Sequence, residues 1–386
     1  MSASSSFAKS PLRVLASLRL TVVCLGFGML LVFLGTLAQV HLGIHAVQAD
    51  YFQSLFVFWS PNGANWSIPV LPGGYLLGVV LLVNLIAAHA TRFQLSKKKA
   101  GIICLHLGVI LLIIGQLLTG LFARETQMRI DEGQTLGYSE AAREVEFAIL
   151  DVSNPDYDQV VAIPETVLAR GGTIQNPALP FTVQIKRFIP NARVTLRAQD
   201  PNAPPSGANS GFGEKVAVTE IPRTVKDDER DLSAALVEIT GVQGSLGIWL
   251  VSNAMAEPQS FTLGERNFTL IMRQRRFPKP FALTLLDFKH DIYPGTDIPK
   301  NFSSRVRLAD PERGENREAL ISMNDPLRYR GFTFYQAGFD NNDKTTILQV
   351  VKNPAMLIPY IACGLVALGL VLQFGMHLFG FVRKAR

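Results

Sequence analysis

One histidine lies inside a long apolar run, and its position is the first indication of chemistry in this chain. His106 follows Leu105 and precedes residues 107–114, which contain no charged side chain. An ionisable side chain in hydrocarbon is costly, so it usually has a polar partner or binds a ligand. Imidazole is also a common axial ligand of haem iron. The sequence therefore predicts that His106 either makes a hydrogen bond between helices or binds a metal centre.

Two further histidines, His89 and His377, lie in other apolar runs, near flanking basic residues. At a rise of 1.5 Å per residue, the nearest flanking Lys or Arg is about 10 Å from His106, about 9 Å from His377 and about 5 Å from His89. The sequence thus predicts three candidate ligands at similar depth, toward one end of a helix bundle. His41 and His45 are expected at the opposite face.

The rotation of each helix is not given by the sequence, so other roles stay open for these histidines. His106 can instead hydrogen-bond a polar neighbour such as Asn84 or Gln116. His89 is close enough to the membrane surface for its ring to reach the interface. Metal transport is a competing function, but the apolar runs contain none of the carboxylate side chains that it usually needs.

Four apolar runs are long enough to cross a bilayer, which takes about 20 residues of helix. They cover residues 20–40, 73–90, 100–121 and 356–380, and none contains Asp, Glu, Lys or Arg. We expect an N-terminal membrane part at residues 1–122, a large domain at 123–354, and a fourth helix with a basic tail at 355–386. The first run exceeds the 7–15 residues of a signal-peptide core, so we expect it to be retained.

Basic residues indicate the orientation, because cytoplasmic loops of membrane proteins are rich in Lys and Arg. They precede the first run, occupy the 91–99 loop and end the chain, whereas the loop 41–72 has none. This distribution predicts a multi-pass membrane protein with both termini cytoplasmic and residues 123–354 on the outer side of the membrane. The net charge of +6 then favours contact with anionic lipid and not with nucleic acid.

The large domain has the alternating pattern of short antiparallel strands. A sandwich or distorted barrel is therefore expected. The turn-rich segment 198–213 is predicted to be a disordered loop. In the loop 41–72, the aromatic spacing of Phe52, Phe56 and Trp59 predicts a short helix at the membrane interface. The predicted strands cover Arg143–Val152, Phe181–Phe188, Ala235–Ile239, Phe268–Met272, Phe281–Phe288, Arg305–Leu308, Ala319–Met323, Phe332–Tyr335 and Thr346–Val351.

No catalytic constellation is evident in this domain. It has no Gly-x-Ser-x-Gly, no phosphate loop and no cluster of metal ligands. Its single histidine, His290, is expected at the surface near a strand end. The three cysteines lie in apolar runs without a Cys-x-x-Cys, and packing is their expected role. Four arginines can either bind carboxylates such as haem propionates or form structural ion pairs: Arg305, Arg307, Arg328 and Arg330.

Several stretches of the chain resemble ResB, also called CcsB, the membrane subunit of System II cytochrome c biogenesis. The order of three spans, a large domain and a last span is also similar, and the resemblance covers most of the chain except about 190–260. The matching stretches are Asn84–Phe93, His106-Leu107-Gly108, Tyr293-Pro294-Gly295, Pro299–Ser303, Pro326–Gly331 and Phe334-Tyr335-Gln336.

The resemblance implies that the chain lies in a bacterial cytoplasmic membrane, with residues 123–354 in the periplasm. It also implies that the chain moves haem across this membrane and delivers it for covalent attachment to apocytochrome c. It implies His106 as a haem-iron ligand, haem b as a transiently bound cofactor, and a CcsA-type partner that carries a tryptophan-rich haem-presenting loop. His89 and His377 do not inherit this role from the resemblance. A thioredoxin-like reductant is a further expected partner, because the acceptor cysteines must be reduced.

This chain contains only Trp59, Trp66 and Trp249, with no tryptophan-rich run. We therefore expect it to be one subunit of a haem lyase complex, with no catalytic residue of its own. The alternative is a membrane scaffold or chaperone that holds apocytochrome c or the partner subunit and binds no haem.

Overall fold

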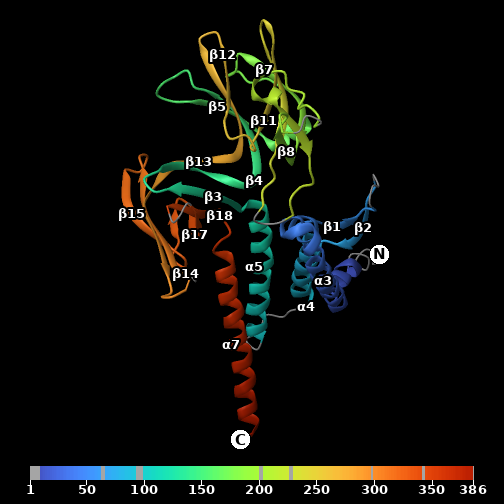
Figure 1. Cartoon of the computed structure of the whole chain (residues 1–386). Coiled ribbons are helices and arrows are strands. Elements are labelled where there is room, and N and C mark those ends of the chain that lie inside the picture. Colours follow the sequence, from blue (N-terminus) through green and yellow to red (C-terminus); the bar gives the residue numbers. More distant parts are fainter. Residues whose placement is uncertain are drawn as a thin grey trace. The chain divides into compact units, whose positions relative to one another are not determined.

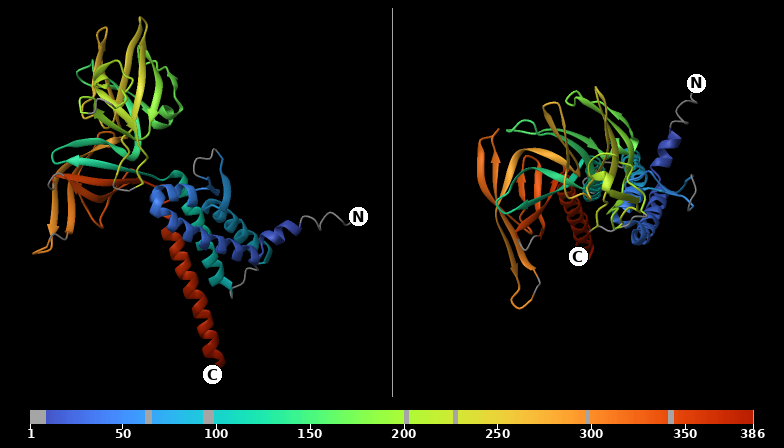
Figure 2. Two further views of the ribbon diagram at one scale, coloured as in Figure 1. Left: turned by 45° about the vertical axis from the view of Figure 1, so that its right-hand side comes forward. Right: turned by 45° about the horizontal axis from the view of Figure 1, so that its top comes forward.

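The computed structural model describes residues 9–61, 66–92, 99–199, 203–225, 229–296, 299–340 and 344–385. It divides the chain into two compact units (Figures 1 and 2). The first, here called the helical unit, comprises Met1–Arg124, Val225–Asp227 and Lys352–Arg386. The second, here called the β-rich unit, comprises Glu125–Thr224 and Asp228–Val351. Residues 93–98 of the predicted basic loop lie outside the described residues.

The helical unit contains the four long apolar helices that the sequence predicts, so this prediction is confirmed. Each is long and apolar enough to cross a membrane by length and composition. The first of these helices, α3 (Leu18–Val47), continues past its predicted end because Gly43, with φ of 77°, allows a kink without ending the helix. A short helix, α2 (Lys9–Leu15), precedes them. The four are α3 (Leu18–Val47), α4 (Gly74–Arg92), α5 (Ala100–Phe122) and α7 (Ile358–Ala385).

The helices α5 and α7 pack closely against each other in antiparallel directions (Figures 1 and 2). Gly101, Gly108 and Gly115 recur at seven-residue intervals on α5, and all three are buried. The α7 residues nearest to them run in the reverse order, with Gln373 beside Gly101 and Ile358 beside Gly115. Small residues let helix backbones approach each other, which is a common basis of helix association in membranes. The glycine series therefore fixes the register of this helix pair.

The expected interfacial helix around Phe52–Trp59 is wrong. A π-helical turn, η1 (Gln48–Phe52), is followed by β1 (Phe56–Trp59), which pairs antiparallel with β2 (Ile68–Pro72). The spacing of the aromatic residues suits a helix, but Phe, Val and Trp favour extended backbone, and Val57 alone in β1 is buried. The apolar side chains that this hairpin and its approach expose are Phe56, Phe58, Trp59, Trp66, Ile68 and Val70.

The β-rich unit confirms the predicted fold class of this part of the chain. Its larger sheet has the strand order β15-β14-β13-β4-β3-β18-β17-β16, with β5 paired to β4 and β12 paired to β13. Because β15 also contacts β16 and β17, this sheet is nearly closed into a barrel. A second sheet has the order β11-β10-β7-β6, and β8 pairs with β9. The elements are β3 (Arg124–Asp131), β4 (Thr135–Asp151), β5 (Gln159–Pro164), α6 (Glu165–Arg170), β6 (Gly172–Ile174), β7 (Phe181–Ile189), β8 (Ala192–Leu196), η3 (Gly211–Lys215), β9 (Val216–Glu220), β10 (Ala234–Gly241), β11 (Gly244–Ser252), β12 (Gln259–Leu263), β13 (Arg266–Ile292), β14 (Pro299–Asp310), β15 (Glu315–Ser322), β16 (Leu327–Tyr329), β17 (Phe332–Asp340) and β18 (Thr345–Lys352).

The long strands β4 and β13 join two hydrophobic cores. Their first pairing segment contributes Phe147 and Phe268 to a core shared with β7, β10 and β11. Farther along β13, Leu283 belongs to a second core built with β3, β14, β17 and β18. The predicted strands Phe268–Met272 and Phe281–Phe288 are therefore parts of one strand. The β4–β13 register shifts between Pro278 and Leu283, where proline lacks the N–H needed for regular pairing.

The segment 203–213 is packed and not disordered as predicted. The Ser206 hydroxyl donates to the Gly213 carbonyl at 2.6 Å, and the Ile248 N–H donates to Asn209 Oδ1 at 2.6 Å. Short polar side chains can satisfy local backbone groups in this way, so a composition typical of disorder also suits an ordered loop. Residues 200–202 of the predicted loop lie outside the described residues.

Candidate functional site

Two of the three predicted site histidines meet between neighbouring helices of the helical unit. His89 on α4 and His106 on α5 have ring centroids 4.8 Å apart and ring planes at 81°. The Nδ1 atom of His106 lies 3.1 Å from Nε2 of His89. The Nδ1 atom of His89 lies 2.9 Å from the carbonyl oxygen of Leu85, one turn earlier on α4. Both rings are half-buried.

Asn84 does not provide the partner for His106 that the sequence left open. Its side chain is 4% exposed and bonds to the start of the chain's first long helix. Its Oδ1 accepts from Thr21 Oγ1 at 2.7 Å, and its Nδ2 donates to the carbonyl of Ser17 at 3.0 Å. Gln116 is exposed and lies about 15 Å farther along α5. The polar group in contact with His106 is therefore another histidine.

His377 is not brought to this pair. It lies exposed on α7, where Gln373 Nε2 donates to His377 Nε2 at 2.8 Å. Gln373 is level with Gly101, so His106 and His377 lie on opposite sides of that level. Their separation along the helix axes is about 13 Å. The prediction of a similar depth is correct for His89 and His106 and wrong for His377. The register between α5 and α7, and not the distance to the flanking charge, determines the position of His377 along the bundle.

The surface beside the histidine pair is apolar. Ile86 lies one turn before His89 and is 49% exposed, and Val109 lies one turn after His106 and is 39% exposed. Residues one turn apart share a helix face. Among the described residues, no three His, Cys, Asp or Glu side chains gather to hold a metal ion. Two imidazoles with an apolar border suit a flat apolar ligand that carries its own metal better than a hydrated ion.

His290 lies near the end of β13 (Arg266–Ile292), as predicted, but its side chain packs in an aromatic cluster and is not fully exposed at the surface. Its ring centroid lies 4.4 Å from that of Phe339 and 5.5 Å from that of Phe302, its register partner on β14. The side chain is half-buried. This packing gives His290 a structural role.

Three of the four candidate arginines are in ion pairs, as the structural alternative predicted. Arg305 and Arg307 each lie 3.6 Å from the carboxylate of Glu318. Arg330 lies 2.9 Å from Asp310 and from Glu312. The fourth, Arg328, is exposed on β16 opposite Thr333.

Arg330 also forms part of a buried network at a tight turn. Arg330 and Gly331, with φ of 47° and 79°, connect β16 to β17, and the Tyr329 hydroxyl donates to Asp310 Oδ2 at 2.8 Å. Burial opposes ionisation of Asp310, but the hydrogen bonds from Tyr329 and the Arg313 N–H and the charge of Arg330 outweigh it and lower its pKa. Burial and the bond to Asp310 raise the pKa of Tyr329 to about 12. These groups stabilise the turn and offer no reactive side chain.

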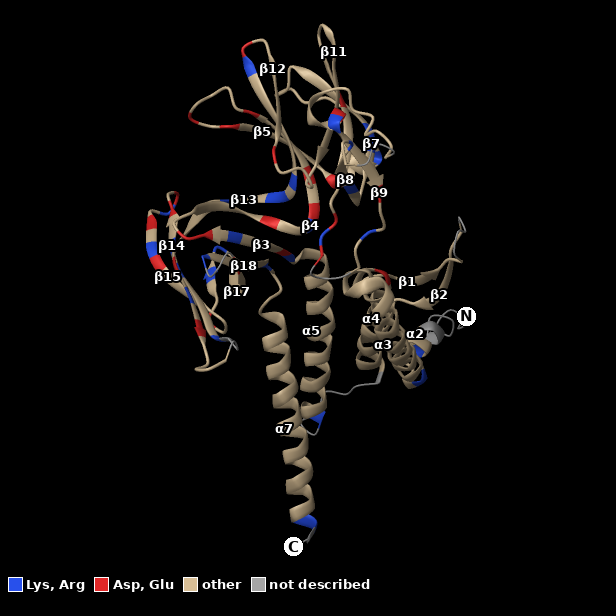
Figure 3. Cartoon of the chain, in the orientation of Figure 1, with Lys and Arg blue, Asp and Glu red and all other residues tan. Residues whose placement is uncertain are grey.

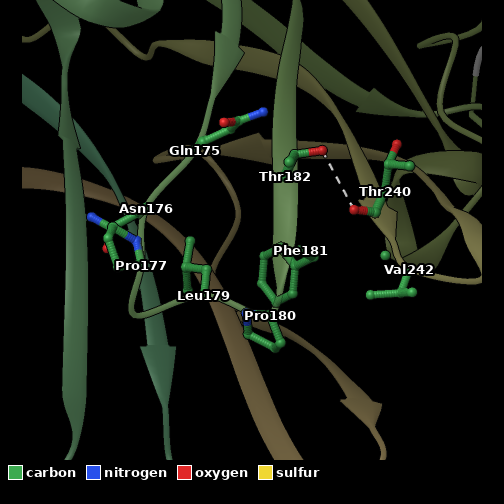
Figure 4. Close-up of a pocket in the computed structure, with 10 residues that line it drawn as sticks. Gln175, Asn176, Pro177, Leu179, Pro180, Phe181, Thr182, Thr240 and Val242 are labelled. Atoms are coloured by element: carbon green, nitrogen blue, oxygen red, sulfur yellow. Dashed lines mark hydrogen bonds between the residues drawn. The ribbon is translucent and has the colours of Figure 1, made fainter.

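An open pocket lies at one end of the second sheet (Figure 4). Its volume is about 720 Å³. Leu179 and Phe181 provide apolar walls, while Gln175, Asn176 and Thr182 provide polar groups. Val242, at its rim, is 99% exposed. No pattern in the sequence indicates this pocket, because its residues come from separate loops and strands.

Residues 232–347, which include β10 to β17, match the ResB-like family. Over 304 residues, 77% of this chain, it is 24% identical to Protein NrfI of Wolinella succinogenes and covers 29% of that protein. Over 60 residues, 16% of this chain, it is 42% identical to Cytochrome c biogenesis protein CcsB of Synechococcus sp. (strain CC9311) and covers 13% of it. The match to the ResB-like family model lies in the β-rich unit, at residues 232–347, and the histidine pair lies outside that range.

Proposed function

We propose that this ResB-like chain acts in cytochrome c biogenesis. In this proposal it binds haem transiently, passes it across the cytoplasmic membrane with a CcsA-type partner, and delivers it for attachment to apocytochrome c. The name of its Synechococcus relative, Cytochrome c biogenesis protein CcsB, supports the general process. The step assigned to this chain rests on one observation, the contact between His89 and His106 on two apolar helices.

The residues at this contact fit haem. The porphyrin ring is apolar and has exposed apolar neighbours such as Ile86 and Val109 to lie against. His106 would hold the iron through its imidazole. The haem would bring its own metal centre, since no three metal-binding side chains gather among the described residues. A single protein ligand between two helices also permits release, which a carrier requires.

The charges of the helical unit support an orientation for this task. Lys99 precedes α5, and Arg383 and Lys384 lie in the last turn of α7. The antiparallel register brings these basic residues to the same end of the helix pair, while the helices themselves carry no charge between their ends (Figure 3). By the positive-inside rule that end is cytoplasmic. The proposal therefore includes cytoplasmic termini and a periplasmic β-rich unit.

The test is the absorption spectrum of the chain purified with a CcsA-type partner. His106→Ala should lower the Soret absorbance per complex at least several-fold and prevent cytochrome c maturation. Added imidazole should restore part of both, because a free ligand can fill the vacated axial position. His377→Ala, a histidine distant from the contact, is the matched control and should keep the wild-type spectrum. Full haem content in His106→Ala would refute the proposed role.

A scaffold that holds a polypeptide and no haem is the second candidate, and the open pocket of the β-rich unit favours it. Its mixed polar and apolar walls suit an extended chain. This function predicts that His106→Ala changes neither the Soret absorbance of the complex, in which the partner can still hold haem, nor cytochrome c maturation. The same spectra therefore distinguish the two functions.

A further inference from the structure

The hydrogen bonds around His89 determine where its proton lies. Its Nδ1 atom is 2.9 Å from the carbonyl oxygen of Leu85. A carbonyl oxygen can only accept a hydrogen bond, so Nδ1 of His89 must carry the hydrogen. In a neutral imidazole, the other ring nitrogen then has the lone pair. Nε2 of His89 is therefore an acceptor.

The tautomer of His89 also determines which ring nitrogen of His106 carries the hydrogen. Nδ1 of His106 is 3.1 Å from the acceptor Nε2 of His89, so it must be the donor of this bond. The reverse direction would require a positively charged His89 between apolar helices, which is costly. A neutral His106 that carries its hydrogen on Nδ1 has its lone pair on Nε2. That nitrogen is the one able to bind a metal.

We propose that His89 is a positioning residue and not a haem ligand. It fixes the tautomer and the ring orientation of His106, so that Nε2 of His106 would be the nitrogen that holds haem iron. This inference rests on the proposed function. Metal-binding histidines commonly have their other ring nitrogen bonded to a second group that selects the tautomer. Here the chain from the Leu85 carbonyl through His89 to His106 performs that task.

The distance between the two rings also argues against a shared iron. Metal–imidazole bonds are about 2 Å long, so two nitrogens on opposite sides of one iron are about 4 Å apart. The facing nitrogens of His89 and His106 are 3.1 Å apart. They are close enough for a hydrogen bond and too close to hold an iron between them. The second axial ligand then comes from elsewhere in the complex.

The experiment compares His89→Leu with His89→Gln in the full chain. Glutamine keeps an acceptor oxygen for the Nδ1 hydrogen of His106, whereas leucine removes it and keeps an apolar side chain. The first measurement determines the histidine tautomer and needs no bound haem. Nitrogen NMR of the haem-free chain, with labelled histidine assigned by comparison with His106→Ala, reports which ring nitrogen of His106 carries the hydrogen. We expect Nδ1–H in the wild type and His89→Gln, and a mixture of tautomers in His89→Leu.

The second measurement is haem affinity from spectroscopic titration. Loss of such a supporting bond typically weakens metal binding 10- to 100-fold, so we expect a loss of about that size in His89→Leu and a change of a few-fold at most in His89→Gln. Imidazole should rescue His106→Ala but not His89→Leu, in which the His106 ring still fills its place.

The outcomes separate this inference from the proposed function. Normal haem binding by His106→Ala would refute the function itself. Loss of haem in His106→Ala, together with an unchanged tautomer and unchanged affinity in His89→Leu, would refute the positioning role alone. Rescue of His89→Leu by imidazole to the same degree as His106→Ala would make His89 a ligand, and would also overturn the inference.

Discussion

The helical unit and the β-rich unit use their polar side chains in opposite ways. The four apolar helices contain few polar groups, and two of them, His89 and His106, bond to each other. The β-rich unit has many charged groups, but those that were candidates for carboxylate binding are largely engaged in internal ion pairs. The histidine pair in its apolar setting is therefore our proposed ligand site, whereas most of the candidate arginines stabilise the sheet.

The pairing of β4 with β13 illustrates how the second unit uses charge. Arg273 lies opposite Glu146 in the strand register, and their side chains are 2.9 Å apart and largely buried. Arg276 lies opposite Glu140 at 2.9 Å in the same way. Cross-strand pairs of opposite charge stabilise a sheet and help to fix its register. The charges therefore support the strands that connect the two cores.

The largest loss of stability should come from a core substitution in the β-rich unit, and it tests whether the two units respond differently. Phe147 is 0% exposed at the centre of the first core. Phe147→Ala leaves a cavity and should lower the free energy of unfolding of this unit by about 3–5 kcal/mol. Denaturant unfolding of the detergent-solubilised chain, followed by tryptophan fluorescence, measures the loss.

Val242→Ala is the control for that change, because Val242 is 99% exposed. It should shift stability by less than about 0.5 kcal/mol. The histidine tautomers should not change in Phe147→Ala, because the core around Phe147 contains no residue of the helical unit. A changed tautomer of His106 would show that the β-rich unit holds the helices in place.

A smaller loss of stability is expected from a substitution that disturbs the contact between α5 and α7. A Cβ on Gly108 would lie 2.6 Å from Cγ2 of Val366 and 2.8 Å from the carbonyl oxygen of Ala362. Gly108→Leu therefore forces the helices apart, and overpacking of this kind costs about 1–3 kcal/mol. Because His106 is half a turn away on the same helix, haem content should fall as well.

Gly364→Leu is the matched control, since a Cβ at Gly364 meets nothing within 4 Å. Thermal unfolding and the Soret absorbance of the two variants measure the difference. Equal stability in both would contradict the register of α5 against α7, and with it the distance of His377 from the histidine pair.

The sequence predicted the long helices well, because each one is a continuous apolar run whose ends are marked by charge or turn residues. It also located most strands that alternate over a buried core, such as the part of β4 around Phe147. The single strand β13 was divided in two, because Pro278 interrupts the pattern without ending the strand. The sequence pattern wrongly predicted a helix at the hairpin β1–β2, because a few aromatic residues fit both the spacing of a helix and that of a strand.

The candidate site was predictable in its residues but not in its geometry. Flanking charges placed His89 and His106 at similar depth, and the structure brings them into contact. The same argument failed for His377, because the level of a residue on α7 depends on the glycines of α5. Helix rotation decides which side chains meet, and a single sequence does not contain it.

The smallest expected effect concerns acid, which should weaken the β-rich unit before the helices. The hydrogen bond from Ser153 lowers the pKa of Asp151 against the opposing effect of burial, and Arg266 adds to the shift. The pKa of Asp310 is also lowered. A carboxyl whose folded pKa lies below its unfolded value, here 3.8, stabilises the fold fully above that value, and the contribution is lost as the pH falls through the folded pKa.

Unfolding curves at neutral pH and near pH 3 should therefore show the β-rich unit weakened by acid, with the helical circular-dichroism signal retained, since the four long helices contain no Asp or Glu. Asp151→Asn and Asp310→Asn should each be less stable than the wild type at neutral pH and should each flatten the acid dependence. Val242→Ala, which keeps both carboxyls, should follow the wild-type curve. An unchanged slope in both Asn variants would show that other carboxylates govern acid stability. Internal charge pairs would then not explain why acid weakens the β-rich unit more than the four long helices, which contain no carboxylates.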